Sequence, residues 1–242
     1  MSSFNKFYET WFDHLNQLVQ QLSTAPKPPT TEEQHKHLDD LVTQTMTHYA
    51  EYYRVKSESV ERDVFNIFTA PWASTLERSL HWITGWRPTT VFHLVYTESS
   101  IMFESNIMDI LRGLRTGDLG DLSPSQFRQV HYIYVLLLWN VYRRVSEMQC
   151  ETVKEENKIT SEMSAWQDDA TELLTASSEF DLMIERLVIV VHKADDLRLR
   201  TLKKMVDMLT TRQAVEFLVA AAELQFGVRL WGRNIDRPRV TA

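Results

Sequence analysis

The stretch WASTLERSLHWITGWRP, residues Trp72–Pro88, combines three tryptophans with signals for a helix start and a helix end. Ser74 is a typical N-cap residue, and Glu77, three positions later, can reach back to the Ser74 amide, which makes a capping box. Gly85 is predicted to end this short helix in the left-handed conformation, and Pro88 is well placed to open the next helix. The stretch therefore predicts a short helix with a defined start and end.

The indoles of this stretch, at Trp72, Trp82 and Trp86, are too large to be exposed together without a reason. The preferred interpretation is a structural knot in the core between helices. The alternative is a ligand pocket floored by the indoles. We call the predicted structural element the tryptophan knot. Its residues are Trp72, Ser74, Glu77, Trp82, Gly85, Trp86, Arg87 and Pro88.

The composition of the whole chain favours an all-α fold. Of the 242 residues, 43% are hydrophobic, which is enough for a core, and only six are Gly and seven Pro. Apolar residues recur with the 3.6-residue period of helices along most of the chain. We therefore predict one domain over residues 1–242, a helical bundle with long antiparallel helices.

The charge and the cysteine content narrow the classes of function. A net charge of −7 gives no general reason to bind nucleic acid or an acidic membrane. The single cysteine, Cys150, excludes an internal disulfide and indicates a reducing compartment. The N-terminus has no apolar segment of the kind that a secretory signal requires. No transmembrane segment is expected, because the longest apolar run is shorter than the roughly 20 residues that a spanning helix needs.

The apolar pattern and the start and stop signals give an expected order of helices. The expected ranges are 3–23, 32–56, 101–115, a long helix from 124, 182–208 and 211–231. Residues 57–71 are expected to be a less regular helix or a loop, and TGDLGDLS at 116–123 is expected to be a loop. The long helix is expected to break near Asn157 and near Ser177–Ser178. A flexible basic tail is expected from Gly232.

Three of these helices have their own capping signals. Thr31 is followed by Gln34, and Thr210 by Gln213, at the spacing of a capping box. In the third, Ser123 is the expected N-cap residue and is followed directly by proline, which is favoured at the first helical position.

The first predicted helix carries more aromatic area than one buried stripe needs. Phe7, Tyr8, Trp11 and Phe12 fall within six positions. Aromatic side chains are favoured anchors at protein interfaces. We therefore treat these four residues as a candidate interaction surface.

No pattern of catalytic or metal-binding residues stands out. The histidines lack the spacing that places two ligands on one helix face, and Cys150 has no nearby partner in the sequence. Glycine-rich phosphate-binding and nucleophile motifs are also missing. The acidic pairs Glu155–Glu156 and Asp195–Asp196 are read as solvated helix faces. We expect no enzyme, no cofactor and no metal site.

The segment LRLRTLKK, residues 197–204, interleaves basic and apolar side chains. The preferred interpretation is the solvent-facing flank of a helix. The alternative is a docking surface for an acidic or calmodulin-like partner.

Several segments resemble one family of plant proteins. They are FYETWF at 7–12, the Trp72–Pro88 stretch, LSPSQF at 122–127 and ADDLRLRTLKKMVDMLTTRQAVEFL at 194–218. In this order they resemble the delay-of-germination domain, which also forms the C-terminal part of TGA-type bZIP transcription factors. Within that family, SLHWITGWRPTTVFHLVYTESS, DILRGLRTGDLGDLSPSQFR and CETVKEENKITSEMSAWQDDA are most similar to the branch named for inaperturate pollen.

The resemblance implies a non-enzymatic regulatory or scaffold protein that acts through protein partners, with self-association as one option. The expected role is pollen aperture formation, in the cytoplasm or at the periphery of the plasma membrane through partners. The alternative is a nuclear regulator in seed dormancy or abscisic-acid signalling, or a partner of TGA-type factors. Direct DNA binding is not expected, because the domain begins at about Phe4 and leaves no room for a basic leucine zipper.

Two further departures from the family pattern matter. Some members bind haem through histidines in the last helix, but the corresponding stretch Leu224–Trp231 contains none, so haem is not expected here. QVHYIYVLLLWNVYR, residues 129–143, separates two segments that follow each other almost directly in the family. This stretch is apolar nearly all round. We interpret it as an insertion, with a buried central helix or an interaction surface as the alternative.

Overall fold

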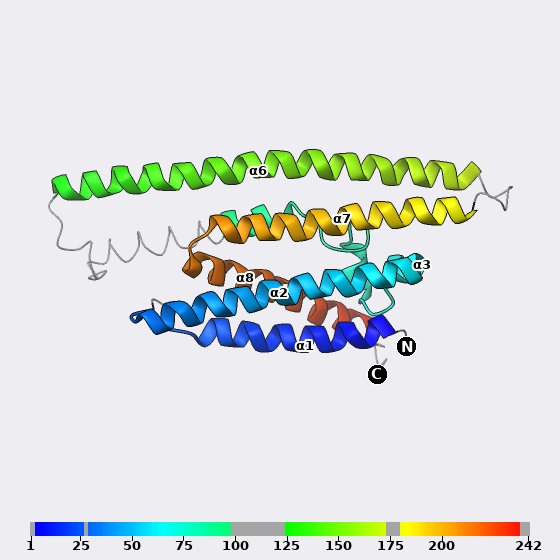
Figure 1. Ribbon diagram of the computed structural model, residues 1–242, viewed down its shortest axis with the longest axis horizontal. Helices are drawn as coiled ribbons and strands as arrows, with labels where there is room; N and C mark the ends of the chain where they lie inside the picture. The colour runs from blue at the N-terminus through cyan, green and yellow to red at the C-terminus, as the bar shows by residue number, and fades with distance from the viewer. Residues whose placement is uncertain (1–2, 27–28, 98–123, 173–179, 238–242) are drawn as a thin grey trace, which may run out of the picture.

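A computed structural model describes residues 3–26, 29–97, 124–172 and 180–237; for residues 124–142, 171 and 172 only the backbone is described. The described residues form a bundle of helices without strands, which confirms the predicted all-α fold (Figure 1). The helices are α1 (Ser3–Thr24), α2 (Glu32–Arg62), α3 (Val64–Thr69), α4 (Thr75–Ser79), α6 (Pro124–Glu172), α7 (Phe180–Met208) and α8 (Thr211–Asp236). Residues 90–97 are also helical.

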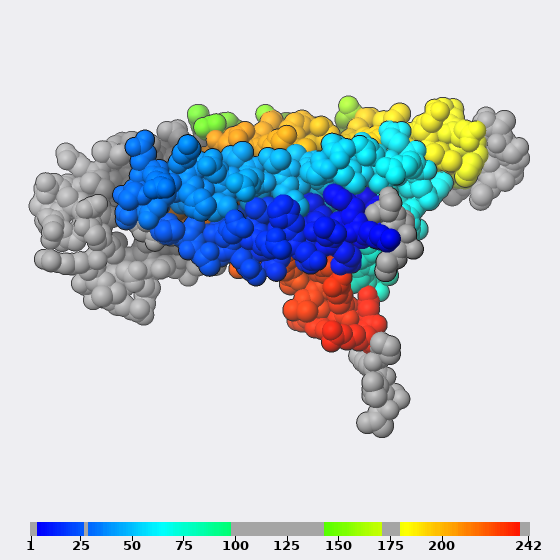
Figure 2. Space-filling view, turned by 60° about the horizontal axis from the view of Figure 1, so that its bottom comes forward, coloured from blue at the N-terminus to red at the C-terminus, as the bar shows by residue number. Residues whose placement is uncertain are grey.

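The long helices pack mostly antiparallel. Helix α2 runs against α1 and α7 and also contacts α8, so it lies at the centre of the bundle. Helix α6 lies along the outer side of α7, and its N-terminal part extends past the end of α7 (Figure 1). The C-terminal part of α8, red in Figure 2, protrudes from the body of the molecule. No helix within the described residues has both the length and the apolarity needed to cross a bilayer.

The helices form where sequence periodicity and capping agree. Helix α1 buries a stripe with helical spacing, which consists of Phe4, Tyr8, Trp11, Leu15, Leu18 and Leu22. The predicted capping box is present at α8, where Thr210 and Gln213 bond each other's backbone amides. At α2, Thr31 is the N-cap residue as predicted, but the Gln34 side chain accepts from the amide of Thr30 rather than that of Thr31. Both helix starts lie where the sequence places them.

Three predicted boundaries are wrong. Helix α2 continues past the expected end at residue 56 to Arg62, because Val60 is buried in the core. The short helix α3 then follows, within the stretch expected to be a less regular helix or a loop. Helix α6 passes through Asn157 without a break. Helix α8 continues to Asp236, so the expected flexible tail from Gly232 begins as helix.

The predicted insertion lies within α6. Residues 129–143 continue the same helix that packs on α7 further along, and the whole helix of 49 residues is about 73 Å long. Whether the stretch is an insertion stays a prediction. The expected helix at 101–115, the loop at 116–123, the Ser123 cap and the break near Ser177–Ser178 lie outside the described residues.

Candidate functional site

Helix α4 begins with the predicted capping box. The Ser74 hydroxyl accepts from the Glu77 amide at 3.2 Å, and Glu77 Oε2 accepts from the Ser74 amide at 2.7 Å. The end of the helix differs from the prediction. Positive φ angles occur at Ile83 (42°) and Thr84 (63°) and not at Gly85. Gly85 instead closes a tight turn through backbone hydrogen bonds with Trp82.

A side chain of α7 closely approaches Gly85. A Cβ at this position would lie 3.2 Å from two guanidinium-group atoms of Arg198, in a space tighter than most Cβ contacts. Arg198 Nε donates to the Trp86 carbonyl at 2.6 Å, and Nη2 donates to the carbonyls of Trp82 and, at 2.7 Å, Ile83. One buried guanidinium therefore satisfies three backbone carbonyls of the turn that contains the strained residues.

Lys56 of α2 also binds this turn. Its Nζ donates to the carbonyl and to the hydroxyl of Thr84, each at 3.0 Å. Asp195 Oδ1 accepts from Lys56 Nζ at 2.8 Å and from Arg198 Nη1 at 2.6 Å. Burial, with the Arg198 charge adding to it and Asp195 opposing it, lowers the pKa of Lys56 to about 8. We call Lys56, Asp195 and Arg198 the buried ion cluster.

Sequence reasoning missed this cluster and misplaced two of its members. Arg198 was assigned to a solvent-facing flank and Asp195 to a solvated acidic pair, yet their exposed fractions are 0% and 6%. Glu156, read as solvated, is also buried, at 1% exposure. A period of 3.6 places Arg198 four positions after the buried Ala194 and four before the buried Leu202. This placement on the core face was the signal available in the sequence.

Each tryptophan contacts a different helix, although Trp72 and Trp86 line the same cavity. Trp72 packs against Phe4 of α1, with ring centroids 4.6 Å apart. Trp86 Nε1 donates to the Tyr53 hydroxyl of α2 at 2.9 Å. Trp82 Nε1 donates to the Thr160 hydroxyl of α6 at 3.0 Å. The tryptophan knot thus contacts three helices that are distant in the sequence, and all three indoles are only partly buried.

The polar members of the knot reach α6 and α8. Arg87 Nε donates to Glu156 Oε2 of α6 at 2.9 Å. The next residue, Pro88, is buried. Glu77 Oε1 lies 3.4 Å from Arg229 Nη1 of α8. Arg229 is itself buried and also pairs with Glu9 of α1 at 2.6 Å. Every long helix of the bundle therefore contacts the knot or the side chains paired with it.

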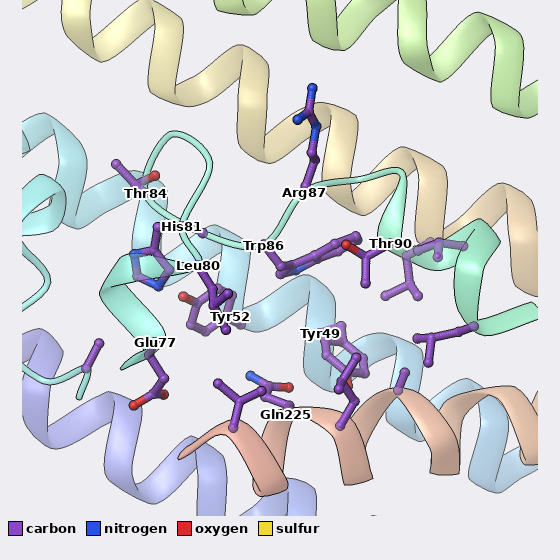
Figure 3. A pocket seen from close by; sticks show the side chains of 18 of the residues that line it. Tyr49, Tyr52, Glu77, Leu80, His81, Thr84, Trp86, Arg87, Thr90 and Gln225 are labelled. Atoms are coloured by element: carbon purple, nitrogen blue, oxygen red, sulfur yellow. The ribbon is translucent and has the colours of Figure 1, made fainter. Parts of the chain in front are cut away.

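A cavity of about 360 Å³ lies between the knot, α2 and α8 (Figure 3). Tyr49 and Tyr52 of α2 line one side, and Trp86 and His81 line another. Leu80 and Leu224, which are 58% and 46% exposed, also line it and mark its opening to the surface. The cavity has the size and the mostly apolar lining of small-molecule pockets in proteins.

The polar groups around this cavity are neutral or already paired. Burial, together with the charges of the buried ion cluster, lowers the pKa of His81 to about 4, so its ring is uncharged at neutral pH. Burial raises the pKa of the Tyr49 and Tyr52 hydroxyls well above their usual range. The carboxylate of Glu77 is held by Ser74 and Arg229, as described above.

Comparison with known proteins places this fold in a family. A family model described as DOG1, seed dormancy control, matches residues 14–97. The chain is 30% identical to the protein DOG1-like 4 of Arabidopsis thaliana over 248 aligned positions, which cover 96% of this chain and 92% of that protein. The chain belongs to the DOG1 family. It is also 27% identical to DOG1-like 1 of Arabidopsis thaliana, over 97% of this chain and 90% of that protein.

The chain is also similar to longer proteins. The chain is 25% identical to the transcription factor TGA7 of Arabidopsis thaliana over 98% of its own length but 59% of that factor. The family model covers Lys56 and the tryptophan knot, whereas Asp195 and Arg198 lie beyond its matched range. The ion cluster is thus completed by a part of the chain that the matched segment does not contain.

The four aromatic residues proposed as an interaction surface are used within this DOG1-family bundle. Tyr8 and Trp11 are buried, and Trp11 Nε1 donates to the His48 carbonyl of α2 at 3.0 Å. Phe7 and Phe12 are partly buried against the core, and Arg229 lies over the Phe12 ring at 4.6 Å. The four side chains do not form one exposed patch, and a role in partner binding stays a prediction.

No group of three or more His, Cys, Asp or Glu side chains in the described part of the chain could hold a metal ion. Cys150 is exposed and its thiol forms no disulfide. The arrangement that remains is a pocket with neutral polar groups beside an exposed helix face.

Proposed function

We propose that this protein is a non-enzymatic plant regulatory or scaffold protein that acts through protein–protein interaction. The observation that carries the proposal is an apolar face on α8, whose C-terminal part protrudes from the body of the molecule (Figure 2). Leu224, Trp231 and Ile235 lie on one side of this helix and are 46%, 72% and 65% exposed. Clustered exposed apolar side chains with a tryptophan are typical of protein interfaces.

The specific role that we propose is pollen aperture formation, at the cell periphery. Its support is the similarity of three segments of this sequence to the inaperturate pollen branch of the family. A nuclear role as a partner of TGA-type factors is the second candidate, and the 25% identity to TGA7 supports it.

The experiment is genetic complementation in plants that lack the protein. The expected defect is pollen with missing or misplaced apertures, with seed dormancy unchanged. The wild-type chain and Leu182→Ala, a control at a 59% exposed leucine of α7, should restore the apertures. Trp231→Ala should not restore the apertures, although the purified variant should have the same melting temperature as the wild type.

The competing outcomes separate the two roles. Normal apertures together with altered dormancy, and a tagged protein in the nucleus, would support the second candidate. Full rescue by Trp231→Ala would show that the α8 face is not the interaction surface.

A further inference from the structure

We propose that the cavity beside the tryptophan knot is a binding site for a neutral, largely apolar small molecule that carries hydroxyl or carbonyl groups. The site extends beyond the protein–protein role and does not depend on it. It is built from α2, α8 and the turn held by the buried ion cluster, so its walls are fixed before any ligand binds.

Unused hydrogen-bonding groups line the cavity. Tyr49 is 8% exposed, and neither its hydroxyl nor that of Tyr52 has a hydrogen-bond partner among the described residues. The same holds for the side chains of His81, Thr90 and Gln225, which also line the cavity (Figure 3). These donors and acceptors face the cavity without a partner from the described part of the protein, so they point to a ligand with its own donors and acceptors.

The charges around the cavity disfavour an anionic ligand. The lining cation Arg87 is paired with Glu156 at 2.9 Å, and the lining carboxylate of Glu77 would repel a second negative charge. His81 is uncharged at neutral pH. Burying an unpaired charge costs far more than burying a neutral hydroxyl group. A carboxylate or a sulfonate should therefore bind much more weakly than a neutral molecule of the same shape.

The first test uses a matched pair of dyes and the full chain. Phenylnaphthylamine is neutral and fluoresces in apolar sites, whereas anilinonaphthalene sulfonate has the same rings and a negative charge. We expect the neutral dye to bind one-to-one, at least about tenfold more tightly than the sulfonate. Equal affinities, or tighter binding of the sulfonate, would overturn the proposal.

The location of the dye is tested with two tryptophan substitutions on α8. Leu224→Trp enlarges a residue at the cavity opening, and Leu230→Trp makes the same change at a 62% exposed position that does not line the cavity. Leu224→Trp should weaken binding at least about tenfold, and Leu230→Trp should leave it unchanged. If both variants bind like the wild type, the dye lies elsewhere and the proposal fails.

The hydroxyl groups are tested by displacement of the neutral dye. Dihydroxybiphenyl should displace it at a concentration about tenfold lower than biphenyl, because each neutral hydrogen bond contributes a factor of roughly two to ten. The double variant Tyr49→Phe/Tyr52→Phe should remove this preference while the dye itself still binds, which also shows that the variant is folded. A preference that survives in this variant, or none in the wild type, would contradict the assignment.

Discussion

Replacing glycine by alanine is expected to have opposite effects on stability at the two glycines of α8, Gly227 and Gly232. A Cβ at Gly232 would lie 2.0 Å from Ser74 Oγ and 2.7 Å from Ser74 Cβ. A Cβ at Gly227 would meet no atom within 4 Å. Both positions lie inside the same helix, so the difference between the two variants isolates the contact between α8 and the start of α4.

The expected magnitudes follow from three contributions. Alanine is favoured over glycine in a helix interior by up to about 1 kcal/mol, so Gly227→Ala should stabilise the protein by roughly that amount. At Gly232 the Ser74 hydroxyl can rotate away only by giving up the N-cap bond, at a cost of about 1 kcal/mol. The Ser74 Cβ cannot rotate away, so the helices must separate, and overpacking of this kind costs about 1–3 kcal/mol. Gly232→Ala should therefore be destabilised by about 1–3 kcal/mol overall.

The assay is urea unfolding followed by far-ultraviolet circular dichroism, with thermal melting as a second measurement. For a chain of this size 1 kcal/mol corresponds to about 2–4 °C, so the two variants should melt several degrees apart. Replacing Ser74 by glycine removes both clashing atoms, and the double variant Ser74→Gly/Gly232→Ala should be more stable than the two single changes predict. If Gly232→Ala is as stable as Gly227→Ala, α8 does not pack on α4 as closely as described.

Four further results are expected. The pKa of His81 is about 4 in the folded chain against about 6.5 unfolded, so the unfolded state binds the extra proton and stability falls as the pH decreases through this range. Between pH 7 and pH 5 the stability should fall by about 2 kcal/mol through His81, and the variant His81→Asn should lack this contribution. If stability depends on pH identically in the wild type and the variant, the lowered pKa of His81 is contradicted. Trp82→Ala should lower the free energy of unfolding by roughly 2 kcal/mol, less than the 3–5 kcal/mol typical of a fully buried tryptophan, because its indole is only partly buried. An unchanged melting temperature would refute this. Titration with haemin should give no Soret band of a histidine-ligated iron, since Leu224–Trp231 has no histidine; a stoichiometric band would mean that another histidine binds the iron. Deleting residues 129–143 should give a more soluble chain that is at least as stable as the full chain. The reason is that the part of α6 after Arg143 keeps its buried contacts, including those of Val145 and Met148. Unfolding of this variant would show that residues 129–143 belong to the core.

Local signals predicted the helices well, because each is written in a few neighbouring residues. The apolar stripe of α1 and the capping boxes at Ser74 and Thr210 need only helical spacing and one hydrogen-bonding side chain. The end of α4 was predicted wrongly for a related reason. Glycine is the usual residue for a left-handed turn, but Gly85 instead lies against Arg198, 113 positions later in the chain. The strained conformations fall instead on Ile83 and Thr84.

The candidate site could not be predicted, because its residues meet only in the folded chain. Lys56 lies 139 positions before Asp195, its partner in the buried ion cluster, and charged residues are usually exposed. The cavity is likewise assembled from α2, the knot and α8. The aromatic cluster of α1 was visible in the sequence, but its burial depends on α2 and α8, which no local pattern specifies.

The buried ion cluster connects the stability of the fold with the shape of the cavity. Lys56 and Arg198 bind the carbonyls of residues 82–86, and the same turn supplies Thr84, Gly85 and Trp86 to the cavity wall. A substitution in the cluster leaves a buried charge or carbonyl unpaired and also releases this wall. Ligand binding and stability would then change together, and neither effect could be assigned to the cavity itself. The Tyr52 hydroxyl has no partner in the described structure, so its removal breaks no hydrogen bond of the fold, and a change in ligand preference there can be attributed to the cavity alone.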